Sequence, residues 1–519
     1  MSDTVKVAVI GSGLAGLSAA YLLTQGHIEG DKKFEVHVFE KNTELGMDAA
    51  SISVGPEKDF RIDVPMRSYM SGYYSHLSKL YEHLDIPAKK ANFSFGWYRI
   101  MQSAKKRQSS IDPSQVASYT DHNSYLVYSG ARTVGYLDMV TSNTITTFWD
   151  YLTEIGSFLW RAFVVAMSYV WIMAISLYFH HAGHLTDPDH SICNMTLGDF
   201  FKTYKFHPFF VHEIFVPLFA AVCTNSYDSM LKYPASDILE YMAVGLFQES
   251  YIVACGVQRV VQTISAPLKH VHLNTQIMSI QPNNPTKFRL IDEHGENYDV
   301  DHIIFATQGN QAISMLQAYT NALKEQSNSL QAYTESVQSV QLQMDMLKKF
   351  HYDSALVINH TDTRLLPTDP SNWRALNLAI VDKSVDPGES HLIVPFPHDT
   401  TMATHILNMT HSSISKGSVY MQTTNPCLAV DPKKILSVTW FERATVTLQS
   451  KRALQDLFQT TKDESEPTLG PCQGKNGIWF VGSYCWKGIP LLEGCVASAE
   501  SVVTKGIAVA ENITIQLPY

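Results

Sequence analysis

The sequence predicts an α/β protein in which two domains are interleaved along the chain. Three apolar segments carry this prediction. They lie at residues 5–10, 300–307 and 477–483, and each has the length and composition of a buried strand that ends at small residues. Strands of one sheet would thus come from near both ends of the chain. The residues between them must then form a second domain.

The first segment continues into a tight turn and a helix. Gly11, Gly13 and Gly16 have the spacing G-x-G-x-x-G, and an Ala/Leu-rich stretch follows them. The first glycine allows the turn, the second lets a pyrophosphate approach the backbone, and the third lets the helix pack closely on the strand. The helix start offers free N–H groups to phosphate oxygens. The predicted pyrophosphate site consists of Gly11, Ser12, Gly13, Leu14, Ala15 and Gly16.

An acidic residue lies close to the spacing that a dinucleotide-binding unit requires. Residues 34–40 predict a second strand, which ends in Glu40, 24 residues after Gly16. A carboxylate at this place binds a ribose hydroxyl group. The sequence therefore predicts a Rossmann-like unit, although this unit alone does not distinguish NAD from FAD.

Two later segments favour FAD. Residues 300–307 predict a strand that ends at Thr307, and residues 477–483 predict another that ends at Gly482 and Ser483. A helix is predicted soon afterwards, and its start would offer further N–H groups to the cofactor. The residues expected there are Glu493, Gly494, Cys495 and Val496. NAD dehydrogenases complete their nucleotide domain in one continuous stretch, whereas these segments extend over nearly the whole chain, as in large flavoproteins.

These motifs together resemble the flavin-containing amine oxidase superfamily, which includes monoamine oxidases, phytoene desaturases and protoporphyrinogen oxidases. Residues 216–224, residues 359–367 and Trp373 are similar to a poorly characterised NAD/FAD-binding oxidoreductase branch. The resemblance covers essentially the whole chain and implies FAD as the cofactor. It also implies that a strand over 272–277 ends beside the adenine, with Ile277 as the contact.

Two segments depart from the superfamily pattern. The Gly-Gly-Arg or Gly-Gly-His stretch that usually follows the ribose acid is replaced by residues 45–49, and the usual Asp-x-Gly is replaced by Asp63-Val-Pro65. Proline removes an N–H group and fixes φ, so contacts at the flavin face can differ here. The further cofactor candidates near these segments are Lys41, Asp48, Met66 and Arg67, of which Arg67 is either a cation near the flavin or substrate or a surface ion-pair partner.

The motifs divide the chain into two discontinuous domains. The FAD-binding domain is predicted to contain residues 1–95, 256–315 and 446–519. The substrate domain is predicted to contain residues 96–255 and 316–445, with a mixed sheet, several helices and an apolar helix at 162–179. Within these blocks, helical periodicity predicts helices over 69–84 and 311–349.

Composition limits the function classes. The net charge of −10 gives no electrostatic support for nucleic-acid binding. The seven cysteines are scattered singly, which favours a reducing compartment. We expect a cytoplasmic protein without a signal peptide, since a strand begins at Val5, and no metal site. Cys485 and Cys495 fall near the predicted flavin, where a thioether to the cofactor is conceivable.

The apolar run at 162–179 contains 18 residues without a charge, which meets the length criterion for a membrane span. A single crossing would separate segments that must meet in one domain, so we expect no span. Two interpretations are left. The run is a core helix or tunnel wall, or it is a helix that docks peripherally on a membrane with its apolar face in the lipid.

We expect an FAD-dependent oxidoreductase that acts on an apolar, lipid-like small molecule by desaturation or by flavin-mediated isomerisation of a double bond. The aromatic residues expected to form an apolar cavity or an ordinary core are Phe206, Phe209, Phe210, Phe215, Phe219 and Tyr227. An amine oxidase, with Tyr484, Trp486 and Lys487 as candidates, is the alternative enzyme. A non-catalytic flavin-binding protein is the alternative of another class. The sequence identifies no catalytic residue and no oligomeric state.

Overall fold

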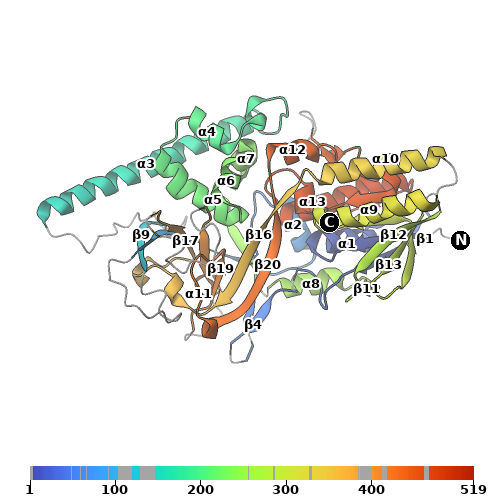
Figure 1. The fold of residues 1–519 in the computed structure, drawn as a ribbon, viewed down its shortest axis with the longest axis horizontal. Coiled ribbons are helices and arrows are strands. Elements are labelled where there is room, and N and C mark those ends of the chain that lie inside the picture. Colours follow the sequence, from blue (N-terminus) through green and yellow to red (C-terminus); the bar gives the residue numbers. More distant parts are fainter. Residues whose placement is uncertain are drawn as a thin grey trace.

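The computed structural model describes most of the chain. The described residues are 4–47, 49–55, 57–58, 60–65, 67–91, 93–102, 120–128, 147–254, 256–284, 287–326, 330–383, 385, 399–411, 418–460 and 467–519. Two sheets and a group of helices organise these residues (Figure 1).

A five-stranded parallel sheet forms the centre of the first domain. Its order is β11 (His270–His272), β3 (Lys33–Phe39), β1 (Thr4–Ile10), β15 (His302–Phe305) and β23 (Ile478–Phe480). Ile10 pairs with Phe39 on one side and with Phe305 on the other. Strands from the beginning, middle and end of the chain are therefore neighbours, which confirms the predicted Rossmann-like sheet built from distant segments.

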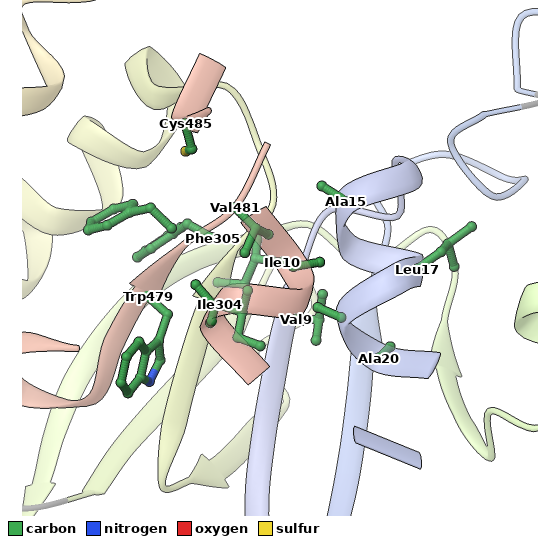
Figure 2. Packing of buried hydrophobic residues seen from close by; sticks show 14 of the residues in the cluster. Val9, Ile10, Ala15, Leu17, Ala20, Ile304, Phe305, Trp479, Val481 and Cys485 are labelled. Atoms are coloured by element: carbon green, nitrogen blue, oxygen red, sulfur yellow. The ribbon is translucent and has the colours of Figure 1, made fainter. Parts of the chain in front are cut away.

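Helix α1 (Leu14–Gln25) packs against this sheet. Figure 2 shows α1 next to β1, which carries Val9, and shows Leu17 on the side of α1 that points away from the sheet. Ile304 of β15 and Trp479 of β23 belong to the same core. The helix buries ten of its twelve residues, because α13 (Leu492–Ser501) packs on it as well. Such burial on several sides explains why the α1 sequence is apolar around its circumference.

A seven-stranded mixed sheet forms the second domain. Its order is β20 (Ile435–Thr445), β16 (His351–His360), β19 (Met421–Thr424), β18 (Met402–Ile406), β17 (Leu376–Val381), β8 (Phe95–Gln102) and β9 (Thr120–Tyr128). The pair β17 and β8 is parallel, and the other neighbours are antiparallel. This sheet confirms the mixed substrate-domain sheet that the sequence predicts.

Helices cover one end of the second sheet. They are α3 (Phe148–His181), α4 (Leu197–Thr203), α5 (Val216–Cys223), α6 (Tyr227–Leu231) and α7 (Ala235–Gly245). Their apolar side chains form a core of their own, which includes Phe200, Phe210 and Phe215 and reaches Trp97 of β8. Most of the predicted cavity aromatics therefore lie within a packed core.

Smaller elements complete the two domains. The further helices are α2 (Ser75–His83), α8 (Val257–Ser265), α11 (Leu407–Thr410), α12 (Leu448–Leu454) and α14 (Ala508–Ala510). The further strands form the sheets β6 (Ser68–Met70), β10 (Ser250–Val253) and β7 (Ala88–Lys90); β12 (Ile277–Asn284), β13 (Lys287–Asp292) and β14 (Asn297–Val300); β2 (His27–Glu29) and β24 (Thr514–Gln516); β4 (Ile52–Val54) and β5 (Phe60–Ile62); and β21 (Phe458–Gln459) and β22 (Thr468–Leu469).

The structure corrects two predicted boundaries. The helix expected over 311–349 is two helices, α9 (Gly309–Gln326) and α10 (Leu330–Leu347). Leu316 of α9 and Leu347 of α10 are buried in the same core as the five-stranded sheet. Both helices thus pack on the core of the five-stranded sheet, beyond the boundary predicted at residue 315. Periodicity shows that a helix has an apolar face but not which sheet covers that face.

The strand expected over 272–277 is also interrupted. β11 ends at His272 and β12 begins at Ile277, and Asn274 between them has a φ of 50°. Ile277 pairs with Asp292 in the three-stranded sheet. The chain thus leaves the parallel sheet at residue 273, and Ile277 belongs to a different sheet from the one that ends beside Glu40.

The apolar helix is longer than predicted. α3 contains 34 residues, and among the described residues it is the single helix long and apolar enough to cross a membrane by length and composition. Only 39% of its most apolar 18-residue window is buried. The helix thus has one side that is covered by protein and one side that is exposed.

Candidate cofactor site

The turn between β1 and α1 is shaped by two glycines that the fold itself requires. Gly11 has a φ of 101°, and its N–H donates to the Phe39 carbonyl at 2.9 Å. A Cβ on Gly16 would lie 2.0 Å from the Gly11 carbonyl oxygen. Both glycines therefore meet steric demands of the strand, the turn and the helix.

Gly13 is different, because no protein atom demands a glycine there. A Cβ at this position would have nothing within 4 Å, and the backbone angles of −62° and 175° suit any residue. The residue also begins α1, whose first turn has neither a side-chain cap nor an acidic residue. A diphosphate fits this place, because the N–H groups of the first turn have no intrahelical acceptor and the dipole favours negative charge.

Glu40 is buried behind the turn and has four donors. Its carboxylate accepts hydrogen bonds from the Ser12 N–H at 3.2 Å and from the Ser12 hydroxyl. Its other oxygen accepts from the Asn42 N–H at 3.0 Å and from the Asn42 side-chain amide at 2.7 Å. The Gly46 N–H donates to the Ser12 hydroxyl oxygen at 2.8 Å. Ser12 therefore joins three chain segments behind the turn, and the side chain does not face the open space at Gly13.

The other residues that were predicted near the ribose do not all lie close to Glu40. Lys41 is exposed. Asp48 and Met66 lie outside the described residues. The Thr275 N–H donates to the Glu40 carbonyl at 2.9 Å, so the segment directly after β11 lies beside Glu40, whereas Ile277 belongs to another sheet. Thr307 follows β15, and its methyl group would lie 3.3 Å from a Cβ on Gly11.

A second helix start approaches the same region. Gly482 follows β23, and its N–H donates to the Ser498 hydroxyl at 3.1 Å. A Cβ on Gly494 would lie 2.9 Å from Trp486 Cβ, so the glycine allows α13 to pack on the turn at 483–486. Val496 is fully buried. Close packing of the neighbouring side chains is therefore sufficient to explain why Gly482 and Gly494 are glycines.

Glu493 has a role that the sequence does not reveal. Its carboxylate accepts hydrogen bonds from the Ser75 hydroxyl at 3.0 Å, the His76 N–H at 2.9 Å and the Leu77 N–H at 3.0 Å. These donors belong to the first turn of α2. The side chain therefore caps α2, and only the backbone of Glu493 is left for a cofactor.

Cys495 and Arg67 bring the two helix starts together. Burial raises the pKa of the Cys495 thiol to about 11, while Arg67 and backbone hydrogen bonds from Ser483 and Ala15 oppose the rise. Ala15 lies in the first turn of α1. Hence the starts of α1 and α13 and the Arg67 side chain share one interior region.

Arg67 is a half-buried cation of this region. Its Nε atom is enclosed and has no hydrogen-bond partner among the described residues. Burial lowers its pKa, and the neighbouring Asp63 opposes the change. The Arg67 side chain thus lies between the interior and the surface, with the Asp63 carboxylate as its charged neighbour. A guanidinium with an unsatisfied donor beside two helix starts fits an anionic or electron-rich group.

Sequence reasoning missed two site residues. The Asp63 carboxylate accepts from the Val257 N–H at 3.0 Å and so caps α8, although the motif around Asp63 departs from its expected form. Arg443 of β20 donates to the Val222 carbonyl at 3.0 Å and to the Pro490 carbonyl at 3.2 Å. A sequence pattern could have indicated Arg443. It is the single basic residue of a strand whose residues alternate between the two faces of the sheet, and it lies on the less exposed face.

The amine-oxidase candidates do not form an aromatic pair. Tyr484 packs edge-to-face on Phe350 with ring centres 5.3 Å apart, whereas Trp486 packs on Phe458 at 5.1 Å. Lys487 is exposed. Both rings reach a cleft of about 530 Å³, in which Lys451 and Asp237 also lie.

Comparison with known proteins agrees with this arrangement. A family model described as an NAD(P)-binding Rossmann-like domain matches residues 9–84. No curated protein matches the chain. Solved structures that match it include a fatty acid isomerase from P. acnes that produces CLA, with a TM-score of 0.54 and 12% identity over 96% of this chain and 98% of that one.

Two amine oxidases match over a similar length. Putrescine oxidase bound to putrescine has a TM-score of 0.52 and 11% identity, and the match covers 96% of this chain and 98% of that one. Cyclohexylamine oxidase from Brevibacterium oxydans IH-35A has a TM-score of 0.50 and 10% identity, with coverages of 98% and 99%. The chain therefore shares the fold of these enzymes over essentially its whole length.

Proposed function

We propose that this protein is an FAD-dependent oxidoreductase that acts on an apolar substrate, by desaturation or by isomerisation of a double bond. The observation that carries the proposal is the open approach at Gly13, in front of an uncapped helix start and close to Arg67. Bound FAD would supply hydride chemistry, and the protein would supply binding, orientation and exclusion of water.

The residues of this chain have separable tasks in the proposal. The first-turn N–H groups of α1 would bind the diphosphate, and Ser12 and Glu40 would hold the turn in shape. A carboxylate accepts about four hydrogen bonds, and Glu40 already has four donors. A ribose hydroxyl group would therefore replace the Asn42 side-chain amide as a donor to Glu40.

Neutral aromatic side chains support an apolar substrate. Tyr73 packs edge-to-face on Tyr241, with ring centres 4.9 Å apart, and Tyr241 packs on Phe219 of the helical layer. Both phenols are uncharged at neutral pH, and burial raises their pKa values further. The fatty acid isomerase of similar fold suggests an acyl chain or another alkene as the substrate class.

The alternatives have less support. The putrescine and cyclohexylamine oxidases of similar fold support amine oxidation. Against it, Tyr484 and Trp486 pack on different rings, and Lys487 is exposed. A non-catalytic flavin-binding protein is favoured only by the altered segment at 63–65. We place the protein in a reducing compartment such as the cytoplasm, since the six described cysteines are free thiols.

Two measurements on the purified chain test the proposal. The visible absorption spectrum, before and after reconstitution with FAD, should contain the two flavin bands. Anaerobic addition of an unsaturated fatty acid should then bleach the 450-nm band on desaturation, or change the double-bond positions without net bleaching on isomerisation. Bleaching by primary amines alone would establish the alternative enzyme, and a chain that cannot bind FAD would refute the proposal.

A further inference from the structure

Helix α3 carries an apolar surface that no described part of the chain covers. At about 1.5 Å per residue its 34 residues extend for roughly 50 Å, and Figure 1 shows it along the outside of the molecule, with its N-terminal part beyond the neighbouring helices. We call its large exposed apolar residues the α3 stripe. They are Phe148, Trp149, Tyr151, Leu152, Leu159, Trp160, Phe163, Met167, Val170, Trp171 and Tyr178.

Only one side of α3 contacts the protein. Val164, Val165, Ile172, Ile175 and Phe179 are buried against the other helices. Before Val164, the described side chains of the helix are exposed or half-buried. The stripe is therefore the opposite side and continues along the N-terminal half of the helix. At its margin the Trp171 Nε1–H donates to the Tyr204 carbonyl at 3.3 Å.

The α3 stripe contains no described charge. Every exposed side chain described between Phe148 and Tyr178 is apolar, small or hydroxylated, whereas Glu154 and Arg161 are half-buried. Arg161 lies along the helix and donates to the Ser157 carbonyl at 3.3 Å. An exposed helix face in water normally carries charged residues, and monomeric proteins rarely expose an apolar surface of this extent.

The tryptophans indicate how the stripe is oriented. Trp149, Trp160 and Trp171 follow one another at intervals of 11 residues, which is within about 20° of three full turns. They therefore share one side of the helix along its whole length. In a membrane-spanning helix the aromatic residues gather at the two ends, whereas a helix that lies along the lipid–water interface holds all of them at one depth.

The sheets exclude a span. β8 and β9 precede α3 in the chain and β17 follows it, yet these three strands are neighbours in one sheet. The parallel sheet likewise combines β1 with β15 and β23. The residues on both sides of α3 therefore lie on one side of any membrane.

We propose that α3 lies in the plane of a membrane surface, with the α3 stripe in the outer part of the lipid and Trp149, Trp160 and Trp171 at the headgroup boundary. A second copy of the chain fits the stripe less well, because helix pairs in water place charged residues beside their apolar seam. Ionic attachment is also disfavoured, since the protein carries a net charge of −10. The inference does not depend on the flavin chemistry.

Flotation of the full chain with phosphatidylcholine vesicles tests this proposal. The wild type should float with uncharged vesicles equally well in 0.1 M and 1 M NaCl, because burial of apolar area is not screened by salt. The double variant Phe163→Glu, Met167→Glu should bind at least roughly tenfold more weakly, since it places two charges in the stripe.

A matched control is available outside α3. Trp440 of β20 is 67% exposed, so Trp440→Glu removes an exposed tryptophan elsewhere and should float like the wild type. Circular dichroism checks that all variants fold. Equal loss of flotation in both variants would overturn the proposal. So would light scattering that shows a wild-type dimer which the double variant dissociates, with no vesicle binding by either form.

Discussion

The carboxylate of Glu493, in the first turn of α13, accepts a hydrogen bond from the His76 N–H, in the first turn of α2, at 2.9 Å. The neighbouring Leu77 N–H donates to the same carboxylate at 3.0 Å. One acidic side chain thus completes the start of a helix that is more than 400 residues away in the chain. The contact ties the C-terminal part of the chain to its N-terminal part.

Replacement of Glu493 separates this structural role from cofactor binding. Glu493→Ala leaves two buried N–H groups of α2 without an acceptor and should lower the free energy of unfolding by about 2 kcal/mol. Glu493→Gln keeps an oxygen acceptor, so its free energy of unfolding should fall by less than that of Glu493→Ala. Urea denaturation of the apo protein measures both. A Glu493→Ala variant with unchanged stability but lost FAD affinity would mean that the side chain binds the cofactor.

The two glycines of the turn should respond in opposite ways. Gly13→Val meets open space and an ordinary backbone conformation, so the variant should fold but lose FAD binding, because the side chain occupies the approach to the α1 N–H groups. Gly16→Ala forces a Cβ to within 2.0 Å of the Gly11 carbonyl oxygen and should destabilise the fold by about 3 kcal/mol.

Thermal unfolding and FAD titration distinguish these two effects. Gly156→Val provides the control, since a Cβ at Gly156 of α3 also meets nothing within 4 Å. It should leave FAD affinity unchanged. Tight FAD binding by Gly13→Val would contradict the proposed diphosphate site.

The sequence predicts the parallel sheet well because its signals are local. Gly11 and Gly16 specify the turn, and the short apolar strands extend the sheet in sequence order: residues 302–305 pair with β1, and residues 478–480 pair with β15. The spacing from Gly16 to Glu40 likewise locates the end of β3. Turns and buried strands depend on residues that are close together in the sequence. The pattern of apolar residues therefore indicates them directly.

The rest of the site depends on contacts between distant segments. Nothing in the sequence around Glu493 shows that its carboxylate caps α2, or that Asp63 caps α8. The partial burial of Arg67 is equally hidden, because one arginine in a polar segment looks the same whether it lies inside or outside. The exposure of α3 required the structure too, since an apolar run is compatible with a core and with a membrane surface.

Asn42 offers a test of how the ribose would bind. Its side-chain amide donates to Glu40 at 2.7 Å and would compete with a ribose hydroxyl group for the same oxygen. Asn42→Ala removes the competitor and should leave FAD affinity equal to the wild type or severalfold tighter. Glu40→Ala should weaken it, since the turn loses the acceptor of Ser12. Fluorescence titration with FAD compares them, and a large loss in Asn42→Ala would show that the amide itself contacts the cofactor.

A buried histidine of the second sheet should make stability depend on pH. His360 of β16 accepts a hydrogen bond on Nδ1 from the Asp362 N–H at 3.0 Å, and its Nε2 lies 2.7 Å from the Thr423 hydroxyl. This arrangement requires a neutral ring, because a proton on Nδ1 would break the first hydrogen bond. Burial lowers the pKa of His360 to about 4, against the opposing effect of Asp362.

The unfolded chain, with a histidine pKa of about 6.5, binds the proton that the folded chain excludes. The contribution of His360 to stability is therefore complete above pH 6.5 and is lost as the pH falls toward 4, by about 1.4 kcal/mol per pH unit. His360→Gln should destabilise the protein at pH 7, and the difference from the wild type should shrink by roughly 3 kcal/mol at pH 4.5. Urea denaturation at the two pH values measures this difference, and a difference that is the same at both would mean that His360 is protonated in the folded protein.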